Sequence, residues 1–232
     1  MNNDSRCDMI AENIKVILHN VAEAKASCGR ESDDIKIMAV SKTVPPEYVN
    51  FAVSKGFSLI GENRVQEFLQ KKEYYVNNAE IQFIGHLQSN KIKYIIDSVS
   101  MIQSVDSVSL AKEIGRQALK NGKCMDILCE VNIGGENSKS GFSPDSLADA
   151  VYELAQTDGI KVRGFMTIPP KSDSPIYLEK MQRLYMDIKA AKIDNTDISV
   201  LSMGMSGDYV DAVKYGSTMV RIGTGLFGAR QK

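Results

Sequence analysis

Residues 35–61, IKIMAVSKTVPPEYVNFAVSKGFSLIG, contain one complete repeat of the predicted fold. Two short apolar runs, 35–41 and 57–61, are typical of buried strands, and the segment 46–55 between them has helical character. A strand, a crossover helix and a second strand together predict a βαβ unit with parallel strands. The first run leads into Lys42, and a lysine at the mouth of a buried strand needs an explanation.

The same alternation continues along the chain. Further strands are predicted at 81–85, 101–104, 125–132, 160–166, 198–203 and 218–222, and helices at 63–78, 88–97, 107–121, 144–157, 175–192 and 207–215. Eight such units predict an α/β fold, a single (β/α)8 TIM barrel domain over residues 1–232, because a doubly wound open sheet normally has fewer strands. An extra N-terminal helix over 5–27 would pack on the outside or close the base of the barrel.

Composition excludes several classes of function. The chain has 232 residues, 43% of them hydrophobic, and a net charge of −1, which favours a globular protein that does not bind nucleic acid. We expect no signal peptide, because the N-terminus carries Asp4, Asp8 and Glu12 and has no apolar core. We expect no contact with a membrane, because no uncharged apolar run approaches the ~20 residues of a span. The four cysteines form no CxxC pair, and His19 and His86 are distant from them in sequence, so we predict no metal site and a cytoplasmic location.

Polar residues follow the predicted strands at the point where a TIM barrel carries its chemistry, the carboxyl ends. They are Lys42, Gly61-Glu62-Asn63, His86, Met166-Thr167, SMGMSGD (202–208) and RIGTGLFG (221–228). Each alone has an ordinary structural explanation, such as a helix cap or a hydrogen-bonded histidine. Their shared position at one rim indicates a site there.

GTGLFG, residues 223–228, matches the GxGxxG pattern, but only four residues follow it, which leaves no room for the βαβ unit and acidic residue of a dinucleotide site. Glycines and a helix N-terminus after the last two strands of a barrel commonly form a phosphate site. Backbone N–H groups and hydroxyls from both loops could bind a phosphate: Gly204, Ser206, Gly207, Gly223, Thr224 and Gly225. The alternative is two glycine-rich turns without a ligand.

Position alone would favour a Lys42 side chain that extends into solvent. With a phosphate site across the rim and Arg221 on the last strand, a different function fits better, since a lysine amine can form a Schiff base with an aldehyde. A small molecule that carries both a phosphate and an aldehyde is pyridoxal 5′-phosphate.

AVSKT, GENRVQE, FIGHLQSNK, VNIGGENSKSGF, LSMGMSGD and VRIGTGLFG follow one another from residue 39 to residue 228. Together these motifs resemble the pyridoxal phosphate homeostasis proteins over nearly the whole chain. The resemblance implies a barrel similar to the N-terminal domain of alanine racemase, with Lys42 bound to the cofactor aldehyde. It also implies that Ser206, Gly223 and Thr224 hold the phosphate, that Arg221 faces the pyridine nitrogen, and that Asn63 and Met203 lie beside the ring.

Two functions stay open: a carrier that serves intracellular vitamin B6 homeostasis without substantial turnover, and an amino-acid racemase. Racemisation needs a base on each face of the substrate carbanion, and in alanine racemase the second base comes from a partner subunit. We expect no counterpart of that racemase's C-terminal domain here, and Arg221 would weaken the electron sink of the ring. We therefore predict a monomeric, non-enzymatic carrier whose partners are pyridoxal 5′-phosphate and PLP-dependent apo-enzymes. The loop 134–142 is a candidate cover of the mouth.

Overall fold

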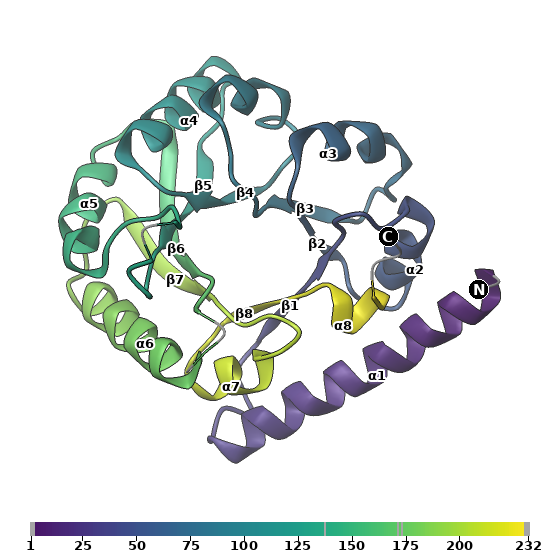
Figure 1. Ribbon diagram of the computed structural model, residues 1–232. Helices are drawn as coiled ribbons and strands as arrows, with labels where there is room; N and C mark the ends of the chain where they lie inside the picture. Colours follow the sequence, from purple (N-terminus) through teal and green to yellow (C-terminus); the bar gives the residue numbers. More distant parts are fainter. Residues whose placement is uncertain (1–2, 137, 171, 173, 230–232) are drawn as a thin grey trace.

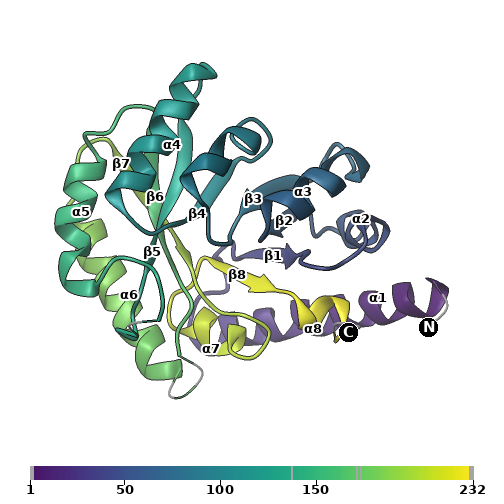
Figure 2. The same ribbon diagram turned by 45° about the horizontal axis from the view of Figure 1, so that its top comes forward.

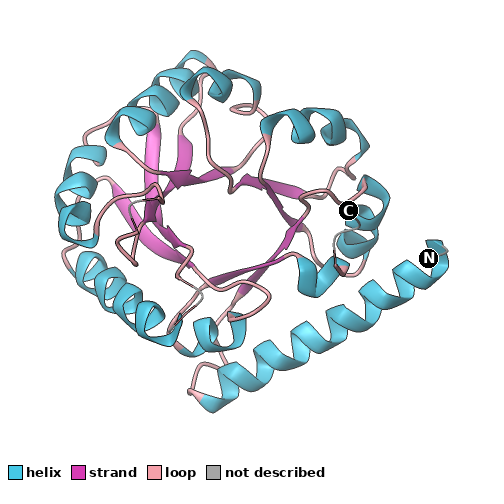
Figure 3. Ribbon diagram, in the orientation of Figure 1, coloured by secondary structure: helices cyan, strands magenta, loops and turns pink. Residues whose placement is uncertain are grey.

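The computed structural model describes residues 3–136, 138–170, 172 and 174–229. Eight parallel strands follow one another in chain order and close into a barrel when β8 pairs with β1 (Figure 1). Helices form a ring around the strands (Figure 3). The predicted (β/α)8 TIM barrel is confirmed.

The strands are β1 Lys36–Val40, β2 Leu59–Glu62, β3 Glu80–Phe83, β4 Met101–Val105, β5 Met125–Val131, β6 Ile160–Thr167, β7 Thr196–Ser202 and β8 Met219–Ile222. The α-helices are α1 Asn3–Ser27, α2 Pro46–Ser54, α3 Val65–Lys71, α4 Val108–Lys120, α5 Leu147–Leu154, α6 Ser174–Ala190, α7 Tyr209–Lys214 and α8 Thr224–Phe227. Three 3₁₀ helices complete the fold: η1 Lys72–Tyr74, η2 Ser89–Tyr94 and η3 Pro144–Ser146.

Side chains fill the inside of the barrel. Two clusters of buried residues lie there, the first formed by Met38, Leu59, Ile84 and Met219 and the second by Met101, Leu128 and Met166. Unbranched methionines suit this space because they adapt to irregular gaps. The first cluster leaves no room for another side chain at Gly61, where a Cβ would lie 2.5 Å from Sδ of Met38.

A second apolar core lies between the sheet and the outer helices, and α4 shows how a helix joins it. Ser107 caps its N-terminus by accepting a hydrogen bond from the backbone N–H of Leu110. Leu110 and Ile114, one turn apart, are buried against the sheet. Complete burial of one such aliphatic side chain stabilises the fold by roughly 1.5–3 kcal/mol.

Glycine allows one close approach between strands. The register shifts on both sides of β6, between β5 and β6 and again between β6 and β7. Gly164 lies at these shifts with φ +144°, and a Cβ there would lie 1.8 Å from the carbonyl oxygen of Val200. Only glycine fits this position, because any side chain would collide with the neighbouring backbone.

Helix α1 packs on the outside of the barrel. This is one of the two predicted arrangements, the other being closure of the base. It runs along α2, α7 and α8 (Figure 2). Ile10, Ile14, Ile17 and Val21 recur at helical spacing and are buried in this contact. The amide of Asn13 donates to the carbonyl of Leu226 at 2.9 Å, so α1 supports α8 directly.

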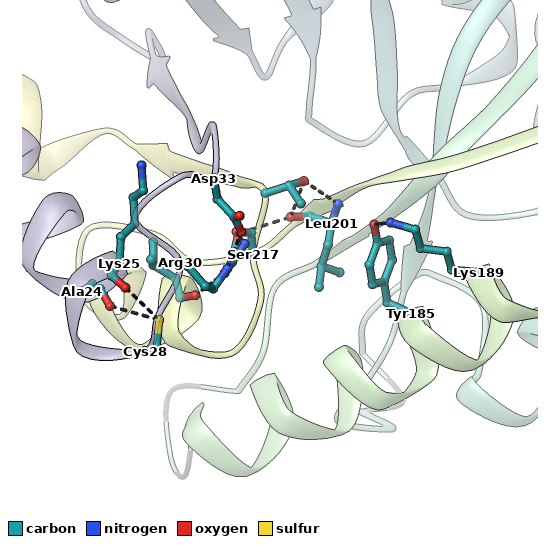
Figure 4. Close-up of polar contacts among 11 residues, drawn as sticks. Ala24, Lys25, Cys28, Arg30, Asp33, Tyr185, Lys189, Leu201 and Ser217 are labelled. Atoms are coloured by element: carbon teal, nitrogen blue, oxygen red, sulfur yellow. Dashed lines mark hydrogen bonds and ion pairs between the residues drawn. The ribbon is translucent and has the colours of Figure 1, made fainter.

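The connection from α1 to β1 is held by Arg30 (Figure 4). Its guanidinium donates to Asp33 at 2.6 Å and to the carbonyl oxygens of Val213 and Ser217, the latter at 3.1 Å. These bonds join the start of β1 to the turn between α7 and β8. They fix the point where the two ends of the sheet meet.

Two predicted helices differ from the structure. The segment 88–97 contains the short 3₁₀ helix η2, with backbone bonds from Lys91 to Gln88 and from Ile95 to Ile92. Ile92 in η2 and Ile95 and Ile96 after it are buried, so packing of this short segment overrides the longer helix that the pattern predicts. The segment 63–78 is helical only to Tyr74, and its last turn is 3₁₀. Among the residues described, no helix is long and apolar enough to cross a membrane.

Candidate functional site

Lys42 lies at the mouth of the barrel. Successive residues of a strand point to opposite faces, and Met38 and Val40 of β1 belong to the interior. Ser41 points the other way, and its fully buried hydroxyl donates to the carbonyl of Gly61. The alternation therefore directs the half-buried Lys42 side chain to the interior side. The strand β1, which leads to Lys42, pairs with β8, and β8 carries Arg221.

Arg221 is a buried cation inside the barrel. Its guanidinium donates to the hydroxyl of Ser202 at 2.7 Å and to the carbonyls of Ser202 and Thr167 at 2.8 Å. Burial lowers the pKa of Arg221 to about 10, against the opposing effect of the Asp208 and Glu130 carboxylates. The side chain therefore stays charged at neutral pH.

A chain of polar side chains crosses the interior from Arg221 and was not predicted. The Ser202 hydroxyl donates to Gln103 at 2.7 Å, and the Gln103 amide donates to Gln82 at 2.6 Å. These side chains are buried and hydrogen-bonded, so the floor of the mouth is polar and ordered. The sequence signal that could have revealed this chain is a glutamine within each of two apolar strands, Gln82 and Gln103.

Asn63 extends β2 on the interior side, two residues beyond Gly61. The Oδ1 atom of its side chain is buried, and no residue in the described part of the chain donates a hydrogen bond to it. Gly85 approaches its backbone so closely that a Cβ would lie 2.0 Å from the carbonyl oxygen of Asn63. Asn63 is thus fixed in place with an acceptor atom that a ligand could use.

The loops after β7 and β8 meet directly. The backbone N–H of Gly225 donates to the hydroxyl of Ser206 at 2.9 Å. Asp208 holds the first loop by accepting from the N–H of Met205 at 2.6 Å and from the hydroxyl of Ser174 at 3.0 Å. Because the oxygen of Ser206 accepts from Gly225, its O–H remains available as a donor.

Gly207, Gly223 and Thr224 surround this contact. Gly207 is exposed and has open space where a Cβ would be. Gly223 precedes α8, and Thr224 is its first residue. The first N–H groups of a helix have no acceptor within it, so Thr224 presents a donor beside Ser206. The structure thus brings together the residues predicted for a phosphate.

Met203 does not join them with its side chain. It follows Ser202, which faces the interior, and therefore points outward. The Met203 side chain is fully buried in the core between sheet and helices. Of Met203, only the backbone is on the side of the mouth.

Two acidic residues and a histidine lie on the far side of the mouth. Burial and the neighbouring Asp106 raise the pKa of Glu130 to about 7, although Arg221 and His86 act to lower it. His86 Nδ1 lies 3.5 Å from Asp106 Oδ2. Glu130 was not predicted as a site residue, because its raised pKa follows from burial among residues distant in sequence.

Within the described ranges, no three His, Cys, Asp or Glu side chains form a group that could hold a metal.

The loop 134–142 lies beside Glu130 and is tied to β5. The Asn132 amide donates to the carbonyls of Glu136 and Lys139, at 2.9 and 3.2 Å. Phe142 donates its N–H to the carbonyl of Glu130 at 2.8 Å. A cavity of about 250 Å³ opens between Glu130, Lys139 and Ile168. Asn137 lies outside the described residues.

The comparisons with known proteins agree with this fold. Residues 13–231 match the family model described as alanine racemase, N-terminal domain. The chain is therefore a barrel of the alanine racemase N-terminal class.

Similar proteins show which family within this class the chain belongs to. A pyridoxal phosphate homeostasis protein of Aquifex aeolicus is 40% identical over 225 residues, which cover 95% of this chain and 98% of the relative. An unknown protein from Bifidobacterium adolescentis superimposes with a TM-score of 0.92 at 32% identity, over 97% of both chains. PipY of Synechococcus elongatus PCC7942, solved with PLP bound, has a TM-score of 0.77 and 29% identity over 90% of this chain and 100% of its own. The chain belongs to the pyridoxal phosphate homeostasis protein family, which confirms the resemblance seen in its motifs.

The raised pKa of Glu130 predicts a pH dependence of stability. The folded protein keeps this proton to about pH 7, whereas a glutamate in the unfolded chain loses it near pH 4.3. The stability that this group contributes is present below the unfolded pKa and is lost as pH rises through about 7. Urea unfolding of Glu130→Gln should therefore show a smaller loss of stability between pH 5 and pH 8 than the wild type.

Glu113→Gln is the control, because hydrogen bonds from Arg116 and Gln117 lower the pKa of Glu113 to about 2, below this pH range. Equal losses in Glu130→Gln and wild type would contradict the assignment.

Proposed function

We propose that this protein binds pyridoxal 5′-phosphate at the mouth of the barrel through a Schiff base with Lys42. Its role is intracellular PLP homeostasis: it holds the cofactor and releases it without substantial turnover of substrates. One observation carries the proposal: Lys42 follows β1 on its inward side, and β1 pairs with β8, after which the chain supplies hydroxyl and N–H donors. The names of the relatives and the bound PLP of PipY support the ligand.

The residues fit the cofactor chemically. Ser206, Gly207, Gly223 and Thr224 would hold the phosphate, since their hydroxyls and N–H groups are donors and an anion needs donors. Asn63, whose buried Oδ1 has no partner among the described residues, would lie beside the ring. Met203 would contribute its backbone there, because its side chain is in the outer core.

Arg221 would donate to the pyridine nitrogen. When bound, the cofactor supplies an aldehyde that captures amines and a ring that withdraws electrons. A charged donor keeps the ring nitrogen unprotonated, which makes the ring a weaker electron sink than a carboxylate partner would. This favours storage over catalysis. Weak racemase-like activity is compatible with the same residues.

The proposal extends to the setting of the protein. Residues 1–232 form one domain that acts as a monomer in the cytoplasm. Free thiols are typical of this reducing compartment. We expect the bound cofactor to be reachable by other proteins, which suits delivery of a reactive aldehyde to PLP-dependent apo-enzymes. Neither nucleic acid nor a membrane is a partner in this role.

Attachment at Lys42 can be tested by chemical trapping. Borohydride reduction of the loaded protein should fix the mass of the cofactor on the peptide that contains Lys42, and Lys42→Ala should abolish that adduct. Lys36→Ala, an exposed lysine at the other end of β1, is the matched control and should keep it. An adduct found wholly on another lysine, such as Lys139, would be inconsistent with this site.

The phosphate site should discriminate between two forms of the vitamin. Hydrogen bonds to a charged group contribute ~1.5–3 kcal/mol each, so Ser206→Ala with Thr224→Ala should weaken pyridoxal 5′-phosphate binding by roughly a hundredfold or more. Binding of unphosphorylated pyridoxal, measured by the same titration of absorbance, should change little. Equal losses for both ligands would locate the phosphate elsewhere.

Carrier and racemase differ in two measurable properties. We expect light scattering at micromolar concentration to report a monomer, and we expect alanine, serine, glutamate and lysine to keep their configuration in the presence of the loaded protein. A stable dimer that racemises any of these at ordinary enzyme rates of ~1–10³ s⁻¹ would establish the alternative function.

A further inference from the structure

Thr43, the residue after Lys42, has an unusual backbone conformation. Its φ is +62°, in the left-handed region that β-branched residues rarely enter. The N–H of Val44 donates to the carbonyl of Ser41 at 2.8 Å, which closes a turn over residues 41–44. Thr43 occupies the third position of that turn, where a positive φ favours glycine or asparagine. Something outside the turn must compensate for the strain.

Glu67 of α3 supplies this compensation. Its carboxylate accepts a hydrogen bond from the backbone N–H of Thr43 at 2.6 Å. The same oxygen pairs with Lys71, whose ammonium group also donates to the carbonyl of Ser41 at 2.9 Å. One ion pair therefore contacts the two peptide groups on either side of Lys42, the carbonyl before it and the N–H after it.

The pair is shielded from solvent, with side chains exposed by only 16% at Glu67 and 11% at Lys71. Burial acts to raise the pKa of Glu67, but the hydrogen bonds from Lys71 and Thr43 outweigh it and hold this pKa below 4.5. The neighbouring Glu62 behaves in the opposite way, since burial raises its pKa despite its hydrogen bond with Tyr75. Of these two carboxylates, Glu67 is the one whose ionised form its hydrogen-bond partners stabilise.

We propose that Glu67 is a positioning residue for Lys42: by holding the N–H of Thr43, it keeps the turn in the strained form that directs the Lys42 amine to the mouth. The inference rests on the proposed function in that Lys42 is the residue that captures the cofactor. Lys71 holds Glu67 and the Ser41 carbonyl in register. Replacement of Thr43 by glycine should make the carboxylate dispensable, because glycine adopts this φ without strain.

The test uses the full chain freed of cofactor and four variants: Glu67→Ala, Glu67→Gln, Thr43→Gly and the double variant Thr43→Gly with Glu67→Ala. The first readout is the rate at which added pyridoxal 5′-phosphate becomes attached to Lys42, trapped with borohydride and located by peptide mass. Glu67→Ala should slow capture about tenfold, the loss expected if the strain of one residue is no longer compensated. Glu67→Gln keeps an acceptor and should retain most of the rate.

In the double variant the capture rate should return to within about threefold of Thr43→Gly alone, since the strain of one residue is then absent. Glu73→Ala, a carboxylate 80% exposed on the neighbouring η1, is the matched control and should behave as the wild type. Capture by Glu67→Ala at the wild-type rate, or a double variant as slow as Glu67→Ala, would overturn the inference.

The second readout needs no cofactor. Hydrogen exchange at the Thr43 amide should accelerate in Glu67→Ala and stay slow in Glu67→Gln, because only the former loses the acceptor. Unchanged exchange in Glu67→Ala would overturn the role of Glu67 even if capture fell. If wild-type protein captures the cofactor at another lysine while exchange follows the expected pattern, the proposed function fails and the positioning of Lys42 by Glu67 stands.

Discussion

The pairing of β8 with β1 is the constraint on which the rest of the structure depends. Closure leaves no free sheet edge among the eight strands, so every strand finds two neighbours for its backbone hydrogen bonds. It also brings the first and last strands together, with Met38 opposite Arg221. A lysine from the start of the chain and donor groups from its end meet at one mouth only because the sheet closes.

Closure also decides which residues share the interior. Alternation along each strand sends every second side chain inward, where methionines pack beside polar groups such as Arg221 and Gln103. Arg221 would be costly to bury without partners, and the carbonyls of Thr167 and Ser202 together with the Ser202 hydroxyl satisfy it. Its charge then contributes to the environment of Glu130 on the opposite side.

The helices outside the barrel act on the mouth as well. Helix α1 contacts α8 through Asn13, and α3 contacts the turn after β1 through Glu67. The first bond reaches the short helix that begins at Thr224, and the second reaches the N–H of the residue after Lys42. Such support from a rigid outer layer fixes a site more accurately than a loop alone could.

Much of this protein could be predicted from its sequence. Hydrophobic periodicity is a local property, so the eight strands, the long N-terminal helix and the rim position of Lys42 followed from short windows of residues. The glycines of the last two loops and the order of six motifs indicated the ligand and the family in the same way.

Tertiary structure alone decided the remaining features. The outward side chain of Met203, the raised pKa of Glu130 and the contact between Glu67 and Thr43 each depend on neighbours from other strands or helices. Sequence spacing contains no information on burial or on the partner of a hydrogen bond when that partner lies on another element. Those quantities are set by distances in the folded barrel, and they determine how the lysine at its mouth is held.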